Sequence, residues 1–184
     1  MSDRRNGFNT SNWSDSVRLL KPREAELIAA HFSRLDGTSR RDRFGYAASD
    51  TAVQAYAARL ATERGVIAGC FPDGTLRGVI EARSTNGDSC YWEGVLSIEP
   101  EWKRKGLGLA LTEFAFKAAK RAGASRFYMR CNVANTTGQY FLARLSRTLR
   151  EEDGEAVATI DLTDPALMAG AMLRAIGQEL RPSA

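Results

Sequence analysis

Three β-rich runs joined by short turn signals constrain the fold more than any other feature of the chain. The runs are 66–71, 76–82 and 90–98, and the turns between them are Pro72-Asp73-Gly74 and Asn86-Gly87-Asp88. Turns this short join antiparallel strands, whereas a parallel pair needs a crossover of a dozen or more residues. The pattern therefore excludes a doubly wound parallel sheet.

The segments around these strands alternate between helical and β-rich patterns. Residues 106–122 have the strongest amphipathic pattern, and they separate the strand at 90–98 from the next strand-like run at 125–133. This order implies a mixed sheet with antiparallel and parallel parts. Further strands are expected at 17–20, 147–150 and 155–162, and further helices at 22–33, 50–65, 136–145 and 164–180. A break at Asp36-Gly37-Thr38 leads into the basic stretch 39–44.

Composition places the chain among single-domain globular proteins. Its 184 residues, 43% of them hydrophobic, suffice for a sizeable core. No apolar run approaches the roughly 18 residues that cross a bilayer, and the start is polar, unlike a signal peptide. The odd count of three cysteines argues against a disulfide scaffold, and the single histidine, His31, excludes sites that need two. We therefore expect a cytoplasmic protein with no membrane partner and no metal site.

The segment Lys103-Arg104-Lys105-Gly106-Leu107-Gly108 lies between a predicted strand and the longest predicted helix. It lacks the glycine spacing of a Walker loop, and Leu111 replaces the third glycine of a dinucleotide fingerprint. A strand, a short loop and a helix start nevertheless bring free backbone N–H groups together, and the glycines allow a phosphate to approach closely. The alternative is a solvated basic turn, and the spacing alone does not decide between them.

The residues around this loop resemble the acetyl-CoA signature of the GNAT N-acetyltransferase superfamily. Residues 98–108 (IEPEWKRKGLG) are similar to the family's strand end near a proline, followed by an Arg/Gln-x-x-Gly-x-Gly/Ala loop, with Lys103 at the Arg/Gln position. Residues 135–142 (NTTGQYFL) resemble a later family motif, in which an Asn opens the helix after the fifth strand. Residues 30–35 and Arg43-Phe44 also resemble Pat-type bacterial protein lysine acetyltransferases.

The resemblance implies a fold and a cosubstrate. The fold is α/β (α+β): a mixed sheet of about seven strands, flanked by helices and splayed between the strands 91–98 and 125–133. The cosubstrate is acetyl-CoA, with pantetheine in the splay and the pyrophosphate on the loop. The cofactor-binding residues implied are Leu96, Ser97, Ile98, Lys103, Arg104, Lys105, Gly106, Leu107, Gly108, Leu109 and Asn135.

Glu93 is the candidate general base for acyl transfer to an amine. Period-2 alternation places Glu93, Val95 and Ser97 on one face of the strand. A carboxylate in an otherwise apolar strand is costly unless it is partnered. Pat-like enzymes, which this chain resembles, carry a glutamate at the matching place. The alternative is a strand glutamate paired with Arg83 or Arg130.

The general acid is where the sequence departs from the family pattern. Many members place a tyrosine seven residues after the motif Asn, to protonate the departing thiolate, and this position is Leu142 here. Tyr140 points roughly 160° away around the helix, and we expect it to pack. Tyr128, on the strand at 125–133, is the candidate substitute.

The resemblance implies an amine acceptor, either a protein lysine or a small molecule. Family members grip the acceptor with their first helices and nearby loops, here residues 31–50, which carry Arg34, Arg40, Arg41 and Arg43. These like charges would repel polycationic acceptors. The net charge of +4 comes with short basic clusters rather than a long basic stripe, so we do not expect nucleic-acid binding.

The sequence predicts an acyltransferase domain over 16–163, preceded by a flexible leader over 1–15. A helix over 164–184 is expected to pack on the domain or at a dimer interface, in a monomer or homodimer. The missing tyrosine at Leu142 leaves open an alternative function, a GNAT-fold module that binds acyl-CoA without catalysis.

Overall fold

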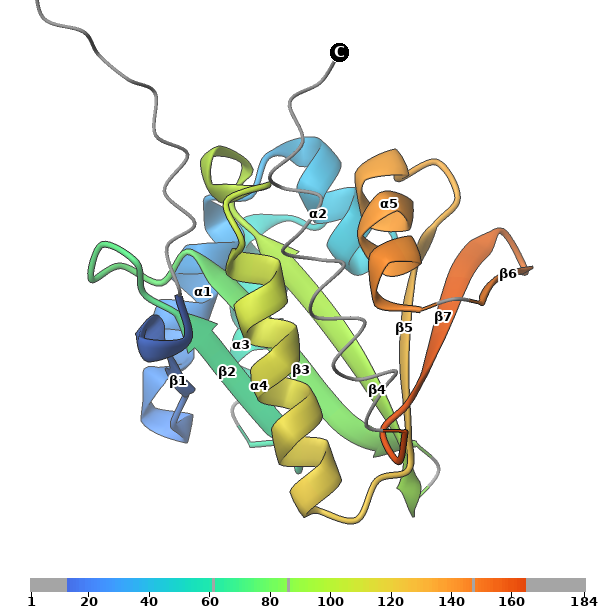
Figure 1. Ribbon diagram of the computed structural model, residues 1–184. Coiled ribbons are helices and arrows are strands. Elements are labelled where there is room, and N and C mark those ends of the chain that lie inside the picture. The colour runs from blue at the N-terminus through green and yellow to red at the C-terminus, as the bar shows by residue number, and fades with distance from the viewer. Residues whose placement is uncertain (1–12, 61, 86, 147, 165–184) are drawn as a thin grey trace, which may run out of the picture.

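A seven-stranded mixed sheet forms the centre of the computed structural model, which describes residues 13–60, 62–85, 87–146 and 148–164 (Figure 1). The strands are β1 (Val17–Leu19), β2 (Val66–Cys70), β3 (Gly78–Thr85), β4 (Asp88–Ile98), β5 (Arg126–Asn132), β6 (Leu149–Glu152) and β7 (Glu155–Asp161). Their order is β1-β2-β3-β4-β5-β7-β6, and only β4 and β5 pair in parallel. The predicted fold class, a mixed sheet of about seven strands, is confirmed.

The predicted hairpins explain the antiparallel parts of the sheet. β2 pairs with β3 and β3 pairs with β4 across the turns predicted from the sequence. The β6–β7 hairpin turns at Asp153 and Gly154, whose φ values are 50° and 77°. Positive φ at two consecutive turn residues matches the right-handed twist of a hairpin, and Asp-Gly adopts it readily.

Helices cover both faces of the sheet (Figure 1). They are α1 (Ala25–Ser33), α2 (Gly37–Phe44), α3 (Asp50–Leu60), α4 (Leu107–Arg121) and α5 (Thr136–Leu145), with 3₁₀ turns η1 (Trp13–Ser16), η2 (Pro22–Glu24) and η3 (Pro100–Trp102). α4 and α5 pack on one face with a core that includes Phe116 and Phe127. α1 and α3 pack on the other, around Phe32 and Val53. The two cores hold the central strands between them.

The sequence analysis assigned no helix to the basic stretch 39–44 and placed a break at 36–38, whereas the structure has the helix α2 over Gly37–Phe44. Asp36 caps the helix, since its side chain accepts a hydrogen bond from the Ser39 N–H at 2.7 Å. Gly45, with φ of 78°, ends it in the left-handed conformation typical of helix C-termini. The helix is short and has few apolar residues, so it lacks the periodicity from which helices are recognised.

The predicted ends of the chain lie largely outside the described residues. Residues 1–12 of the predicted leader and residues 165–184 of the predicted last helix lie outside the part that the structure describes. The end of the leader region is ordered, because Trp13–Ser16 form η1 and Trp13 packs edge-on against Trp102 with ring centroids 6.2 Å apart. Among the described helices, none combines the length and apolar character needed to span a membrane.

Candidate active site

A gap opens between β4 and β5 toward the ends of both strands. The two strands pair only from Tyr91 to Gly94 on β4 and from Arg126 to Met129 on β5. Beyond that point β4 continues to Ile98, bonded only to β3, and β5 continues along β7. Figure 1 shows the two strands diverging toward the end where α4 begins. The predicted splay is confirmed, and residues 95–98 present a backbone edge that bonds to no described strand on the β5 side.

Gly94 marks the last paired position of β4, and its missing side chain is required there. A Cβ at this residue would lie 2.4 Å from Cε1 of Phe127. The Phe127 ring, fully buried, therefore packs against the β4 backbone where the strands begin to separate. Any larger residue at position 94 would push β4 and Phe127 apart.

The loop before α4 turns its backbone toward this gap. Arg104 and Gly106 both have positive φ, 60° and 89°, and Gly106 is the N-cap of α4. No described side chain caps this helix, and the first N–H bonded within it is that of Ala110, to the Gly106 carbonyl at 3.2 Å. The three N–H groups before Ala110 are thus available to an external acceptor, and the helix dipole favours an anion there.

Neighbouring side chains hold this loop in place. The Trp13 indole N–H donates to the Lys105 carbonyl at 2.7 Å. The Lys105 ammonium lies 4.8 Å from the ring centroid of Trp102, and the Lys103 ammonium donates to the Ser39 hydroxyl at 2.8 Å. The last contact joins the loop to α2. Two of the three predicted phosphate-binding cations are therefore fixed by neighbours beside the helix start.

The start of α4 lies directly against the open part of β4. A Cβ at Gly108 would be 3.2 Å from Cδ2 of Leu96 and 3.5 Å from Cε2 of Phe141 on α5. The structure thus brings the predicted strand residues 96–98 and the predicted loop residues together at one end of the sheet. Glycine at position 108 keeps this approach close without strain.

Asn135 lies at the other side of the gap, where β5 is followed by α5. Its Oδ1 accepts a hydrogen bond from the Gly138 N–H at 2.8 Å, which confirms the predicted N-cap. A Cβ at Gly138 would lie 3.0 Å from Cβ of Cys131. The short Asn-to-Gly cap therefore lets α5 sit close to the end of β5.

Glu93 and Tyr128 face each other across the last paired part of β4 and β5. Oε1 of Glu93 accepts from Nε of Arg130 at 2.9 Å, and Arg130 also bonds Glu155 at 3.2 Å. The Glu93 side chain is 24% exposed. The alternative pairing with Arg130 predicted from the sequence therefore exists, whereas Arg83 pairs with Glu63 instead. Exposure and pairing leave the Glu93 carboxylate reachable from solvent.

Tyr128 and Tyr140 have different surroundings. Tyr128 stacks on Tyr91, with ring centroids 6.1 Å apart and planes 19° apart. Tyr140 is 57% exposed, and its ring packs against the Arg144 guanidinium, whose central carbon lies 5.5 Å from the ring centroid. Leu142, which replaces the family's tyrosine, is buried against the core. Leu142 lies two residues after Tyr140, on the side of α5 that packs against the sheet.

A buried polar cluster next to the gap was not predicted from the sequence. The His31 ring on α1 makes two contacts, Nε2 to the Ser97 hydroxyl at 2.9 Å and Nδ1 to Glu99 Oε1 at 3.2 Å. Arg34 Nε and Arg77 Nη1 donate to Glu99 at 2.8 and 2.9 Å. The only sequence signal for this cluster was that Ser97 shares a face of β4 with Glu93. The partner residues come from tertiary packing.

Three of the four arginines named in residues 31–50 are paired with carboxylates, whereas Arg41 is exposed. Arg34 bonds Glu99 and the Leu76 carbonyl. Arg40 donates to backbone carbonyls and pairs with Asp50. Arg43 pairs with Glu81 and Tyr56 in the core. Each of these three charges thus has a carboxylate partner, and the expected repulsion of polycationic acceptors stays a prediction.

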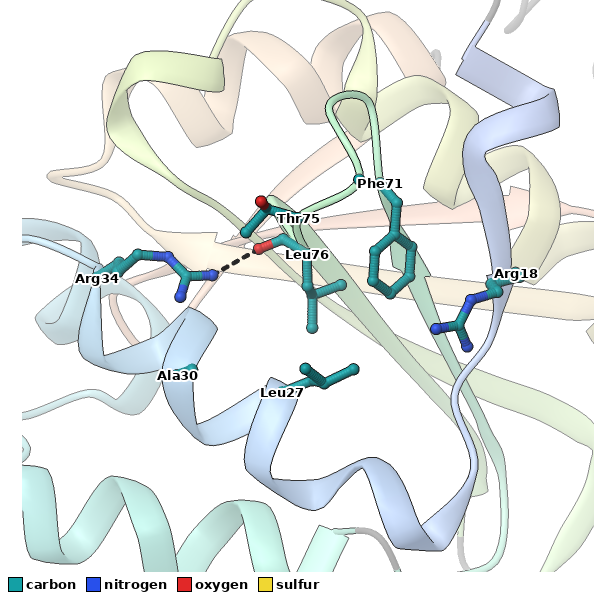
Figure 2. A pocket seen from close by; sticks show the side chains of 8 residues that line it. Arg18, Leu27, Ala30, Arg34, Phe71, Thr75 and Leu76 are labelled. Atoms are coloured by element: carbon teal, nitrogen blue, oxygen red, sulfur yellow. Dashed lines mark hydrogen bonds between the residues drawn. The ribbon is translucent and has the colours of Figure 1, made fainter.

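An open pocket lies elsewhere, between α1 and the β2–β3 turn. It has a volume of about 460 Å³, and Arg18, Leu27, Arg34 and Phe71 are among its lining residues (Figure 2). Figure 2 shows the Arg34 guanidinium directed to the Leu76 carbonyl and Arg18 on the opposite side. None of the predicted catalytic or cofactor-binding residues lines this pocket. These residues gather instead around the gap between β4 and β5, which is therefore the candidate site.

Comparisons with known proteins agree with this arrangement. The family model described as "Acetyltransferase (GNAT) family" matches residues 35–146. The chain is similar to the GNAT domain of S. lividans PAT, at 18% identity over 79% of this chain and 89% of that chain, with a TM-score of 0.67. Among curated protein sequences, none matches the chain.

Two further solved structures have the same fold. One is an acetyltransferase of the GNAT family from Bacillus anthracis, with 14% identity, 80% and 95% coverage of this and that chain, and a TM-score of 0.63. The other is the PaiA N-acetyltransferase from Thermoplasma acidophilum in complex with coenzyme A, with 17% identity, 79% and 97% coverage and a TM-score of 0.59. At these identities the structures establish the fold.

Proposed function

This chain belongs to the acetyltransferase (GNAT) family, and we propose that it moves an acetyl group from acetyl-CoA to a primary amine. The observation that carries this proposal is the gap between β4 and β5, which opens beside the uncapped start of α4. Free N–H groups at a helix start bind phosphate, and an unpaired strand edge can bond the amides of pantetheine. Both features lie at one end of the sheet.

The residues of the loop fit a pyrophosphate group. Arg104 and Gly106, both with positive φ, lead the loop backbone to the helix start. The Lys103 and Lys105 side chains are held beside it. On the other side, Asn135 and the edge at 96–98 flank the gap, where the proposal places pantetheine. A relative of the same fold, PaiA, was solved with coenzyme A, which supports this class of cosubstrate.

In the proposed reaction, Glu93 is the general base that takes a proton from the incoming ammonium group. The Glu93 side chain is 24% exposed and lies beside the point where the strands separate. Its carboxylate contacts Nε of Arg130 at 2.9 Å, so Arg130 holds the carboxylate in position. Backbone groups of 96–98 would hold the thioester carbonyl, on which negative charge develops during attack.

The proton donor to the thiolate is assigned less directly. Tyr128 is the phenol predicted for this role, and it lies opposite Glu93 rather than opposite the free edge at 96–98. A thiol pKa near about 8.5 makes the thiolate a fair leaving group without a strong acid. Equal turnover by a Tyr128→Phe variant would dismiss the phenol as the donor.

The acceptor is a primary amine, on a protein lysine or on a small molecule. Arg34, Arg40 and Arg43 are each paired with a carboxylate, whereas Arg41 is exposed, so the charge of residues 31–50 does not by itself identify the amine. The acceptor must therefore be found by assay rather than by charge.

The proposal is tested by measuring CoA thiol release from acetyl-CoA with a panel of amines. The panel contains single-lysine peptides with acidic or neutral flanks, free amino acids and spermine. We expect at least one amine to raise the rate of thiol release well above hydrolysis, with the acetyl group found on the amine by mass spectrometry. Binding of acetyl-CoA without release for any amine would instead support the alternative function, a non-catalytic acyl-CoA module, which the buried Leu142 favours.

A further inference from the structure

The cluster of Ser97, His31 and Glu99 has hydrogen bonds whose directions can be assigned. Glu99 is ionised: burial alone would raise its pKa, but bonds from His31, Arg77 and Arg34 outweigh this and lower it to about 2. A carboxylate only accepts, so Nδ1 of His31 carries the proton and donates to Glu99. In a neutral ring Nε2 then has a free lone pair, and the Ser97 hydroxyl donates to it.

His31 is held in this neutral form by its surroundings. The side chain is fully buried, and burial lowers its pKa. The charged groups that face it are Glu99, which raises the pKa, and Arg34 and Arg43, which lower it, with Arg77 behind Glu99. Nε2 is therefore a proton acceptor at neutral pH, and Glu99 would stabilise the imidazolium that forms on accepting a proton.

The proposed function places the thioester beside Ser97. Ser97 is one of the residues 96–98 at the open edge of β4. Its side chain lies on the same face of the sheet as that of Glu93, because the two residues are four positions apart in a regularly paired strand. It is 7% exposed, whereas His31 and Glu99 are at most 1% exposed. The chain of hydrogen bonds thus starts at the site and runs inward.

A second observation indicates which step of the reaction needs these hydrogen bonds. The family's tyrosine donor is replaced by Leu142, which is buried in the core and holds no proton to give. The proposed reaction removes two protons from the ammonium group: Glu93 takes the first, and the second must leave the nitrogen after attack and end on sulfur.

We propose that Ser97 and His31 form a proton relay that carries this second proton from the amine nitrogen to the CoA sulfur; the inference rests on the proposed function. As the N–C bond forms, the thioester carbonyl becomes an oxyanion. The proton on nitrogen passes to Ser97 Oγ while the Ser97 proton passes to His31 Nε2. As the carbonyl re-forms and the C–S bond breaks, the proton returns through Ser97 to the thiolate. The relay ends as it began, neutral. Ser97 is a catalytic residue here, and His31 and Glu99 are positioning residues.

The first test needs only the wild-type protein, because His31 is the one histidine of the chain. With ¹⁵N-labelled histidine, the two ring nitrogens give unambiguous NMR signals. The relay predicts a neutral ring protonated at Nδ1 at pH 7. A ring protonated at Nε2, or a charged ring, would overturn it whether or not any variant folds.

The second test compares variants with the best amine of the panel. Ser97→Ala is expected to lower kcat at least tenfold with KM for acetyl-CoA unchanged, since general acid–base groups contribute about 10²–10⁴-fold. His31→Gln keeps hydrogen-bonding groups but accepts no proton, and it should lose as much. The double variant should lose no more than either, because the two act as a unit. Additive losses would contradict the relay.

The matched control is Ser146→Ala, which also removes a buried hydroxyl. This hydroxyl contacts the carbonyls of Thr148 and of Thr159 on β7, away from the proposed relay. Ser146→Ala should leave kcat unchanged. In the wild type the part of the acid limb of the kcat–pH profile that His31 contributes should have a midpoint below the ordinary histidine value of about 6.5, and Ser97→Ala should remove this part while the part from Glu93 stays.

Two outcomes separate the relay from its rivals. Full activity of Ser97→Ala overturns the relay while the acetyltransferase function stands. Acetylation of Ser97 itself during turnover, seen as a mass increase on its peptide, also overturns it, since the relay never acylates the hydroxyl. Failure of the proposed function is a different result, in which the wild type releases no CoA with any amine.

Discussion

A Glu93→Gln variant is expected to lower kcat by about 10²–10⁴-fold while it binds acetyl-CoA almost as tightly as the wild type. Gln has nearly the same shape and can still bond Arg130, but it cannot accept a proton from the incoming amine. The measurement is CoA thiol release at saturating acetyl-CoA, with binding followed separately by calorimetry. An amide at this position changes chemistry rather than packing, because the side chain is already 24% exposed.

The matched control removes the other carboxylate that contacts Arg130. Glu155 bonds Arg130 at 3.2 Å and its side chain is 40% exposed, so Glu155→Gln perturbs the same arginine without touching the base. We expect its kcat to stay within about twofold of the wild type, since exposed ion pairs contribute little. Equal activity of Glu93→Gln and Glu155→Gln would remove Glu93 from the mechanism.

A Glu99→Gln variant is expected to lower the free energy of unfolding by about 3 kcal/mol. This figure follows from the lowered pKa, from 4.5 to about 2, at about 1.4 kcal/mol for each unit. The variant leaves Arg34, Arg77 and His31 without their shared acceptor in a site where the Glu99 side chain is 2% exposed. Thermal unfolding should show a midpoint lower by roughly 6–12 °C.

The pH dependence gives this prediction a sign. Because the folded pKa of Glu99 is lowered, its contribution is fully present above pH 4.5 and is lost as the pH falls toward 2. Wild type and variant should therefore differ at pH 7 and converge in acid. The control is Glu113→Gln, which breaks an exposed pair with Lys117 and should cost less than about 1 kcal/mol. A Glu99→Gln midpoint no lower than that of the control would refute the assigned role of Glu99.

Much of the sheet could be predicted because its strands are joined by local signals. The turn at Asp153-Gly154 fixes β6 beside β7, and the turn at Pro72-Asp73-Gly74 lies between β2 and β3. The long helix 107–121 follows from its amphipathic pattern. The splay between β4 and β5 came from family resemblance, since nothing in the local pattern states where two strands stop pairing.

The unpredicted parts depend on contacts between distant segments. α2 has few apolar residues, and its Arg43 is stabilised by Glu81, which is 38 residues away along the chain. His31 looks like an ordinary helix residue until β4 is placed beside α1, 66 residues on. The charge of residues 31–50 has the same dependence, because the sequence does not show that Arg34, Arg40 and Arg43 pair with Glu99, Asp50 and Glu81.

The candidate site divides in the same way. The loop at 103–108 carries a local pattern, and its backbone conformation agrees with the anion-binding role predicted for it. The relay of Ser97 and His31 has no local pattern, and it became visible only from the hydrogen bonds between α1 and β4. Loop motifs can thus be predicted from sequence, whereas relays built from two elements need the fold.

The measurement that tests the account most directly is the thermal shift of the protein with and without acetyl-CoA, for the wild type and a Gly106→Glu variant. At about 100 times Kd, acetyl-CoA should stabilise the wild type by about 2.7 kcal/mol, or roughly 5–10 °C. A carboxylate at the start of α4 should repel the pyrophosphate and abolish the shift.

Gly123→Glu is the matched control, because Gly123 has φ of 93° against 89° for Gly106 and lies at the far end of α4. Both substitutions strain a left-handed backbone and add one negative charge, but only one does so at the proposed site. The account predicts a shift for the wild type and Gly123→Glu and none for Gly106→Glu. No shift in the folded wild type, or equal shifts in all three proteins, would contradict it.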